Sequence, residues 1–156
     1  MALPARGSAA EAEPERAAPS APPACTAVGP GASLQQALDT ASEGSAICLA
    51  AGSYPGPLRV ERSVTLWGPP DAVILSNGEG TTLRAVGAVK LLGFTVDGSG
   101  GRFDTLDSAI HVEGSGALIE GVLVRNATFG ILVEKADHVM IRRNRVTGKG
   151  GDALGL

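Results

Sequence analysis

AIHVEGSGALIEGVLVRN at residues 109–126 is followed by GILVEKADHVMIRRNRV at residues 130–146, and short apolar segments recur in both stretches with similar spacing. Equivalent positions lie 21 or 22 residues apart: Val112 and Val133, Ile119 and Ile141, and Val124 and Val146. An earlier pair of segments, 64–66 and 89–91, is offset by 25 residues. A period near 22 residues is typical of a repeat protein in which each period forms one structural unit.

Each period contains about three segments of two to four residues whose apolar side chains mostly alternate, which is the pattern of short strands. The predicted strands are residues 46–49, 58–60, 64–66, 73–75, 83–85, 89–91, 94–96, 109–112, 118–119, 122–124, 130–133, 139–141 and 145–146. Three strands per period predict an all-β fold, a right-handed parallel β-helix, because each strand can pair with its equivalent in the preceding coil. The LxxLxLxxN pattern of leucine-rich repeats is absent, and a β-sandwich would show longer strands joined by hairpins.

The composition agrees with a narrow, regular interior. The chain has 156 residues, of which 44% are hydrophobic, only 3% are aromatic and 22 are Gly. Small and β-branched side chains fit the inside of such a coil, and Gly suits the tight turns between its faces. A formal net charge of −3 differs from the basic balance of nucleic-acid-binding proteins. No stretch approaches the roughly 18 apolar residues of a membrane span.

The sequence predicts two regions. Residues 1–24 are rich in Ala and Pro and contain Leu3 as the only large aliphatic side chain besides Met1, so we expect a disordered tether, with no secretory signal peptide visible. Residues 25–156 form the β-helix domain, which begins with a capping helix at 33–42. Ser33 and Gln36 have the spacing of a helix N-terminal capping box, and Gly44 suits the position just after the helix.

Cys25 and Cys48 are the only cysteines and lie on either side of the predicted helix. A disulfide between them would close a loop of 24 residues (48 − 25 + 1) and contribute ~3 kcal/mol. It would require an oxidising compartment. The alternative is two buried free thiols, which behave as small apolar side chains. Two isolated cysteines do not complete a tetrahedral metal site.

Two stretches carry a resemblance to known families. GSYPGPLRVERSVTLWG (52–68) with VKLLGFTV (89–96) resembles the opening coils of pectin-lyase-like β-helix proteins of the carbohydrate-binding and sugar-hydrolase (CASH) repeat type. AIHVEGSGALIEGVLVRNATFGILVEKADHVMIRRNRVTG (109–148) resembles the NosD family of periplasmic accessory proteins. The matching positions are Ile110, Asn126, Phe129, Gly130, Ile131, Arg143, Asn144 and Gly148.

The resemblance implies a role and a location. NosD-like proteins are non-enzymatic scaffolds outside the inner membrane that serve copper-centre maturation of nitrous oxide reductase. They work with an ABC transporter (NosF and NosY), a copper chaperone and nitrous oxide reductase, so copper would come only through partners, and no cofactor or metal motif carries over to this chain. The family continues beyond GDALGL (151–156), so we expect the chain to be a fragment truncated at its C-terminus.

The segment 98–108 interrupts the period and contains candidate functional residues. Arg102, Asp104 and Asp107 lie within it and Asp97 directly precedes it. Clustered carboxylates with a basic residue could serve a polysaccharide lyase, hydrolase or epimerase, or bind Ca²⁺. A carbohydrate-binding module is a further alternative. The same carboxylates could equally make turn hydrogen bonds in a solvated loop.

The remaining candidates are polar residues of the last two periods. His111, His138 and Met140 could be soft metal ligands, but strand alternation places His111 opposite Ile110 and Val112, and a surface or packing role fits all three.

Asn126 and Asn144 are expected at coil corners, where a stacked ladder of amides would satisfy turn carbonyls. The last coils are also locally basic, and their arginines form either a solvated face or a docking patch for an acidic partner: Arg125, Arg142, Arg143 and Arg145.

Overall fold

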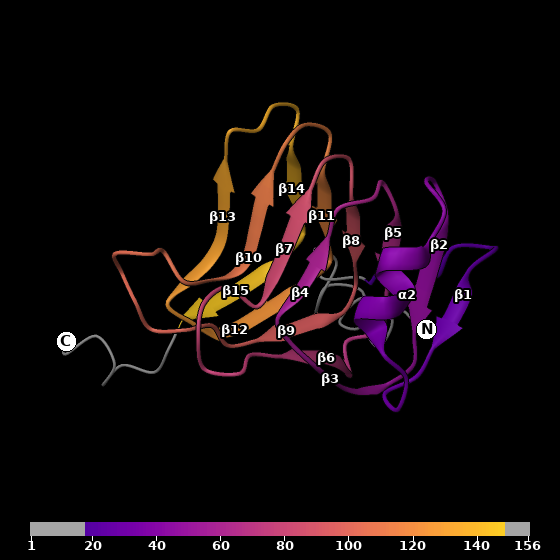
Figure 1. The fold of residues 1–156 in the computed structure, drawn as a ribbon, viewed down its shortest axis with the longest axis horizontal. Helices are drawn as coiled ribbons and strands as arrows, with labels where there is room; N and C mark the ends of the chain where they lie inside the picture. Colours follow the sequence, from indigo (N-terminus) through magenta and orange to yellow (C-terminus); the bar gives the residue numbers. More distant parts are fainter. Residues whose placement is uncertain (1–17, 149–156) are drawn as a thin grey trace, which may run out of the picture.

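The chain winds into a parallel β-solenoid of about six turns with one short helix, which confirms the predicted parallel β-helix fold (Figure 1). The computed structural model describes residues 18–148. Each complete turn contributes one strand to each of three sheets, and all strand pairs within the sheets are parallel. Strand β1 and the helix α2 lie at one end of the stack, and β13, β14 and β15 lie at the other (Figure 1).

The three sheets are named A, B and C. Sheet A has the order β1 (Thr26–Val28), β2 (Ala46–Leu49), β5 (Thr65–Trp67), β8 (Lys90–Leu92), β11 (Leu118–Glu120) and β14 (Met140–Arg142). Sheet B has the order β3 (Gly52–Pro55), β6 (Ala72–Leu75), β9 (Thr95–Asp97), β12 (Leu123–Ala127) and β15 (Arg145–Gly148). Sheet C has the order β4 (Leu58–Val60), β7 (Leu83–Val86), β10 (Ser108–Glu113) and β13 (Phe129–Glu134).

The observed register confirms the repeats seen in the sequence. The predicted partners pair directly across neighbouring strands: Val112 with Val133, Ile119 with Ile141, Val124 with Val146, and Leu66 with Leu91. Strands β1 and β3 were not predicted. Both are short and lie in the first coil, where no earlier period gives a repeat to compare.

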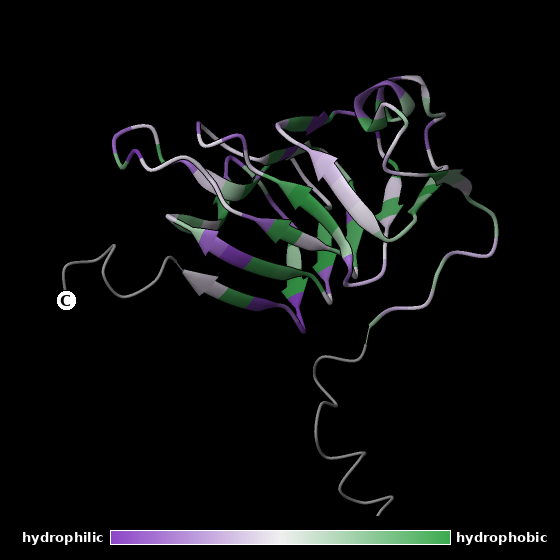
Figure 2. Cartoon of the chain, turned by 90° about the horizontal axis from the view of Figure 1, so that it is seen from below, coloured by the Kyte–Doolittle hydropathy of each residue, from purple (hydrophilic) through white to green (hydrophobic). Residues whose placement is uncertain are grey.

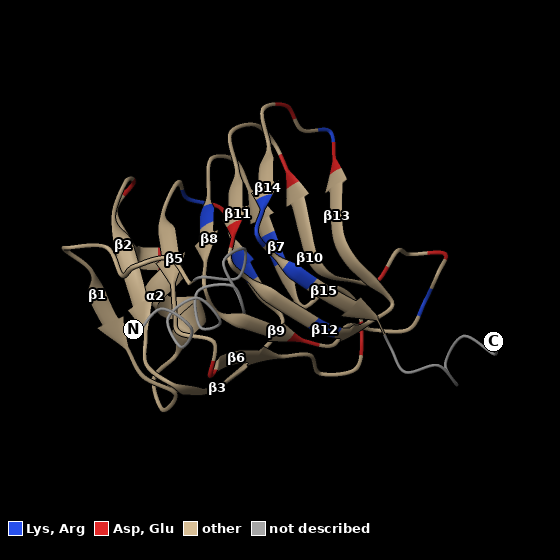
Figure 3. Ribbon diagram, turned by 180° about the vertical axis from the view of Figure 1, so that it is seen from behind, with Lys and Arg blue, Asp and Glu red and all other residues tan. Residues whose placement is uncertain are grey.

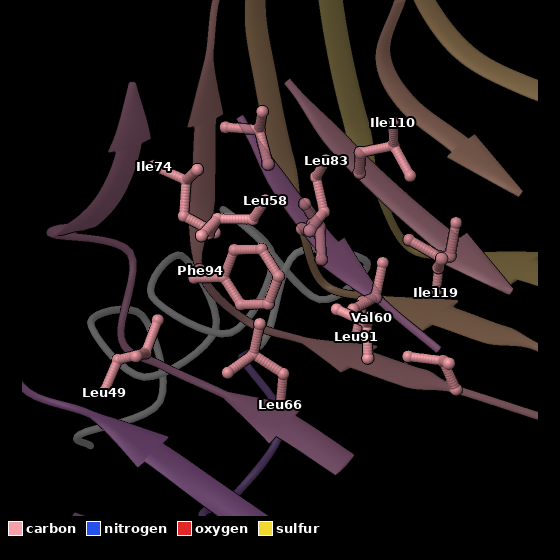
Figure 4. Close-up of a cluster of buried hydrophobic side chains, with 14 of the residues drawn as sticks. Leu49, Leu58, Val60, Leu66, Ile74, Leu83, Leu91, Phe94, Ile110 and Ile119 are labelled. Atoms are coloured by element: carbon pink, nitrogen blue, oxygen red, sulfur yellow. The ribbon is translucent and has the colours of Figure 1, made fainter. Parts of the chain in front are cut away.

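The core is a set of stacked apolar columns inside the coil. Leu66, Leu91 and Ile119 form one column in sheet A, and each is 0% exposed. Figure 4 shows side chains from all three sheets meeting in the interior, with the Phe94 ring among them. The alternation of apolar and polar residues is visible along several strands as green and purple bands in Figure 2. The side chains at alternate positions of each strand point inward, and their burial holds the coils together.

Helix α2 (Leu34–Thr40) lies beside the first strand of sheet C. The Ser33 hydroxyl accepts a hydrogen bond from the Gln36 N–H at 3.2 Å, which confirms the predicted N-cap. Gln35 accepts from the Arg59 N–H and donates to its carbonyl, both at 2.9 Å. Because β4 is an edge strand of sheet C, Gln35 satisfies backbone groups at an otherwise open edge. The prediction for Gly44 was wrong: the helix ends at an extended Ala41, and Gly44 (φ 82°) turns the chain into β2.

The first coil is fixed by covalent and polar contacts. A disulfide joins Cys25 to Cys48 with 5.8 Å between their Cα atoms, within the range that the bond requires. The buried hydroxyl of Tyr54 lies 3.0 Å from the Val28 carbonyl oxygen and 2.6 Å from that of Ala50, and burial raises the pKa of Tyr54. Residues 1–17 of the predicted tether lie outside the described residues, whereas the Pro19 carbonyl accepts a hydrogen bond from the Trp67 indole at 2.7 Å.

The last described coil keeps the register but not the burial of the coils before it. Val133, Ile141 and Val146 pair with buried residues of the preceding coil, yet they are 38%, 43% and 49% exposed. Ile131 packs against the core and is only partly buried. The stretch GDALGL (151–156), at which we expect the chain to be truncated, lies outside the described residues.

Candidate functional site

The outer face of sheet C carries two rows of side chains that cross the strands. Arg59, Arg84, His111 and Leu132 form the first row, because each pairs in register with the next. Val86, Glu113 and Glu134 form the second row. In Figure 3 the ends of β10 and β13 are both red, where these two glutamates end their strands. The register between neighbouring coils thus brings residues from four successive strands onto one surface.

An open cleft of about 890 Å³ lies at the N-terminal side of this face. Its walls include the connection between β6 and β7, the segment 101–107 and the side chain of Gln35, which bonds the backbone of β4. The polar residues that line it include Gln35, Arg59, Thr81, Arg84, Arg102 and Asp107. Arg59 pairs with Glu61, and Arg84 pairs with Glu113 at 2.6 Å. The cleft therefore combines guanidinium groups with carboxylate, hydroxyl and amide groups, which suits a polar ligand.

The predicted functional loop is held together by its own carboxylates. Arg102 pairs with Asp104 at 2.8 Å, and both side chains are exposed. Asp107 is only 3% exposed; it accepts hydrogen bonds from the Thr105 hydroxyl at 2.7 Å and the Arg102 N–H at 3.0 Å. These bonds lower the pKa of Asp107, the Thr105 hydroxyl most, and the Arg102 guanidinium lowers the pKa of Asp104. Both carboxylates therefore act as turn-forming acceptors, as one of the alternatives for this loop expected.

Asp97 does not belong to this cluster. It ends β9 on sheet B, where its two carboxylate oxygens accept from Arg125 Nε at 3.0 Å and Asn126 Nδ2 at 2.9 Å. The pairing joins two neighbouring coils. Sequence proximity alone grouped Asp97 with the loop, whereas the register of β9 with β12 assigns it to the basic residues of the next coil.

The predicted docking patch is partly neutralised within the chain. Arg142 and Arg143 lie 3.2 Å and 3.8 Å from the two carboxylate oxygens of Glu120, on the coil before. Arg125 is paired with Asp97 as described above. Arg145 is exposed on β15. Figure 3 shows these arginines in blue across β12, β14 and β15, so the last coils carry a basic surface with embedded acids.

His111 faces away from the core, as strand alternation predicted, but it is more buried than a surface residue would be. It alternates with the core residues Ile110 and Val112, yet it is only 6% exposed. Its Nε2 atom lies 2.8 Å from Glu134 Oε1, but the two atoms form no hydrogen bond. His138 and Met140 are exposed and lie elsewhere on the coil. The missed signal was the pair His111 and Glu113 on one strand face, with Glu134 one period later.

The two asparagines make separate contacts and no common ladder. Asn144 lies between β14 and β15, where its side chain accepts from the Val122 N–H at 2.8 Å and donates to the Ile119 carbonyl at 2.9 Å. Asn126 lies within β12, has a left-handed backbone (φ 60°) and bonds the Asp97 side chain. Only Asn144 satisfies backbone groups at a corner in the way the sequence predicted.

Comparisons with known proteins returned no matching family model, no matching curated protein and no matching solved structure. Across residues 18–148, none of the helical structure is long and apolar enough to span a membrane.

Proposed function

We propose that the chain is a non-enzymatic scaffold that works in an extracytoplasmic compartment such as the periplasm. The observation that carries this proposal is the disulfide between Cys25 and Cys48, which ties the segment before the helix to the first coil. Disulfides of this structural kind persist in oxidising compartments and are rare in the cytosol.

The functional loop supports a scaffold more than a catalyst. A general acid at neutral pH needs a raised pKa, whereas hydrogen bonds lower the pKa of both Asp104 and Asp107. Their oxygens are already engaged by Arg102 and Thr105. The loop is thus built to keep one shape, which is what a surface presented to another protein requires.

The resemblance to the NosD family supplies the finer proposal. The partners would be an ABC transporter (NosF and NosY), a copper chaperone and nitrous oxide reductase, and copper would be held by those partners. The basic surface around Arg142, Arg143 and Arg145 is the docking patch we assign to an acidic partner. Charge complementarity of this kind increases association rates and selects partners.

The test is deletion of the gene that encodes the chain in its own host, with the wild-type gene restored as the control. We expect nitrous oxide reductase from the deletion strain to lack copper, and to regain it on complementation. A complementing gene with Arg142, Arg143 and Arg145 all changed to Gln should restore less copper. Full copper loading in the deletion strain would reject the NosD-type role.

A second candidate function is carbohydrate binding, and the cleft favours it. A volume of about 890 Å³ is in the range of small-molecule sites, and three arginines at its walls suit a sugar that bears carboxylates. Titration of uronic-acid oligosaccharides into the chain, followed by NMR, tests this role. Loss of binding in Arg59→Gln with retention in Arg145→Gln would support it, and no shift of cleft resonances with any oligosaccharide would reject it.

A further inference from the structure

We propose that the outer face of sheet C binds one divalent transition-metal ion of the Zn²⁺ class between His111, Glu113 and Glu134. Each of these residues offers one ligand atom, and the three atoms all lie within 4.8 Å of one another. The residues come from two neighbouring strands, β10 and β13, whose register pairs Glu113 with Glu134 directly. This site is separate from the docking patch and adjoins the cleft through Arg84, which lines the cleft and bonds Glu113, and it does not depend on the proposed function.

The histidine supplies an independent argument. Its side chain is 7% exposed, and Nε2 is a buried nitrogen with no hydrogen-bond partner among residues 18–148. Buried polar atoms are nearly always partnered, so this nitrogen needs an explanation. A strand position that alternates with the core would normally hold a solvent-facing side chain, as Arg59 does in the same row. A metal ion held between the imidazole of His111 and the two carboxylates would supply the partner that Nε2 lacks.

The geometry around Nε2 fits ligation better than hydrogen bonding. Glu134 Oε1 lies 2.8 Å from Nε2, yet the two atoms form no hydrogen bond. Two ligands of one tetrahedral Zn²⁺, each ~2.0 Å from the ion, lie ~3.3 Å apart, and neither lies on the other's bonding axis. A small outward shift of the half-exposed Glu134 carboxylate would open the space between the two atoms.

Glu113 is already oriented for this role. One of its oxygens, Oε1, accepts from Arg84 at 2.6 Å, which leaves Oε2 for an ion. Metal-ligating carboxylates commonly accept such an outer hydrogen bond, which fixes their orientation. The positively charged guanidinium of Arg84 also repels a metal cation and lowers its affinity, so we expect micromolar rather than nanomolar binding.

The donor set selects the kind of ion. One imidazole nitrogen and two carboxylate oxygens suit Zn²⁺ and its neighbours in the first transition row. Ca²⁺ requires six to eight oxygen ligands, and Cu⁺ prefers sulfur, which none of the three residues offers. Three protein ligands leave a fourth position for water or for a group from another molecule.

The experiment is calorimetric titration of ZnCl₂ into the full chain, without a histidine tag and after treatment with a chelator. We expect one Zn²⁺ per chain, no saturable binding of Ca²⁺, and at least a tenfold loss of Zn²⁺ affinity in both His111→Gln and Glu134→Gln. The matched controls are His138→Gln, which changes the other histidine, and Glu120→Gln, which changes a carboxylate that is paired to arginine. Both controls should bind Zn²⁺ as the wild type does.

A direct readout accompanies the titration. Zn²⁺ should shift the ring resonances of His111 and leave those of His138 in place, as seen by NMR. Glu134→Gln keeps the test sharp if His111→Gln unfolds, because Glu134 is 42% exposed and its replacement is isosteric. Failure of the wild type to bind Zn²⁺ with a Kd below ~1 mM, or equal binding by the two site variants and the wild type, would overturn the proposal; in the first case the cluster is a histidine–carboxylate pair without a metal.

Discussion

Replacement of Leu91 by Ala tests the stacked-column description of the core. Leu91 is 0% exposed and lies between Leu66 and Ile119 in sheet A. The change removes the isopropyl group of Leu91 and leaves a cavity between the coils on either side. This cavity cannot collapse without breaking strand pairing. A buried Leu→Ala change in such a setting lowers the free energy of unfolding by about 3 kcal/mol or more.

Leu75→Ala is the matched control for this change. Leu75 is the same residue type in the neighbouring sheet, but it is 38% exposed and follows the buried Ile74. Its truncation should cost less than about 1 kcal/mol. Urea unfolding of both variants, monitored by far-ultraviolet circular dichroism, gives the two values directly.

A difference of less than about 1 kcal/mol between the two variants would refute the column description, because the interior would then be no more tightly packed than the surface. The urea dependence carries further information. In a solenoid each coil contacts only its neighbours, so a cavity in the central coil should also reduce the cooperativity of unfolding. A lower slope for Leu91→Ala but not for Leu75→Ala is the expected sign.

Three other perturbations have expected outcomes. Reduction of the disulfide between Cys25 and Cys48 should lower the free energy of unfolding by about 3 kcal/mol, because the 23-residue separation of the two cysteines closes a loop in the unfolded chain; equal melting temperatures with and without reductant would contradict this. Asn144→Ala should cost about 1–2 kcal/mol through two lost backbone contacts, whereas Asn126→Gly, which removes only a side-chain bond to the partly buried Asp97 and tolerates the left-handed backbone of that position, should cost less in the same urea assay. The pKa of Asp107 is lowered in the folded chain, so its stabilising contribution is present above its unfolded pKa of about 3.9 and is lost as the pH falls through the folded value; thermal melts between pH 2 and pH 7 should show a weaker acid dependence for Asp107→Asn than for the wild type.

The interior of the coil could be predicted from the sequence because its rule is local. Alternation along two to four residues places Ile110 and Val112 inside, and the 22-residue offset pairs Ile119 with Ile141. Ser33 was recognisable as a helix cap for the same reason, since the contact spans three residues. Each of these features follows from neighbours in the chain and needs no knowledge of the turns between coils.

The outer-face contacts could not be predicted because their spacing differs from coil to coil. Arg84 bonds Glu113, 29 residues later, whereas Arg142 bonds Glu120, 22 residues earlier. A uniform period would have misassigned the first of these pairs. Gln35 was also missed, because its partner is the backbone of Arg59, 24 residues away, and a backbone partner leaves no trace in the sequence.

The segment 98–107 shows how the fold tolerates this variation. Thr95 pairs with Leu123 and Val96 with Val124, an offset of 28 residues, although the next coil returns to 22 between Val124 and Val146. The strands stay in register because each is aligned by its own inward side chain, and the extra residues leave the coil as a loop. Loop length is therefore uncoupled from strand pairing, so residues such as Arg102 can line a cleft while the interior stays regular. Function in this chain is accordingly expected on the outer face and the loops, where the sequence is free to differ between coils.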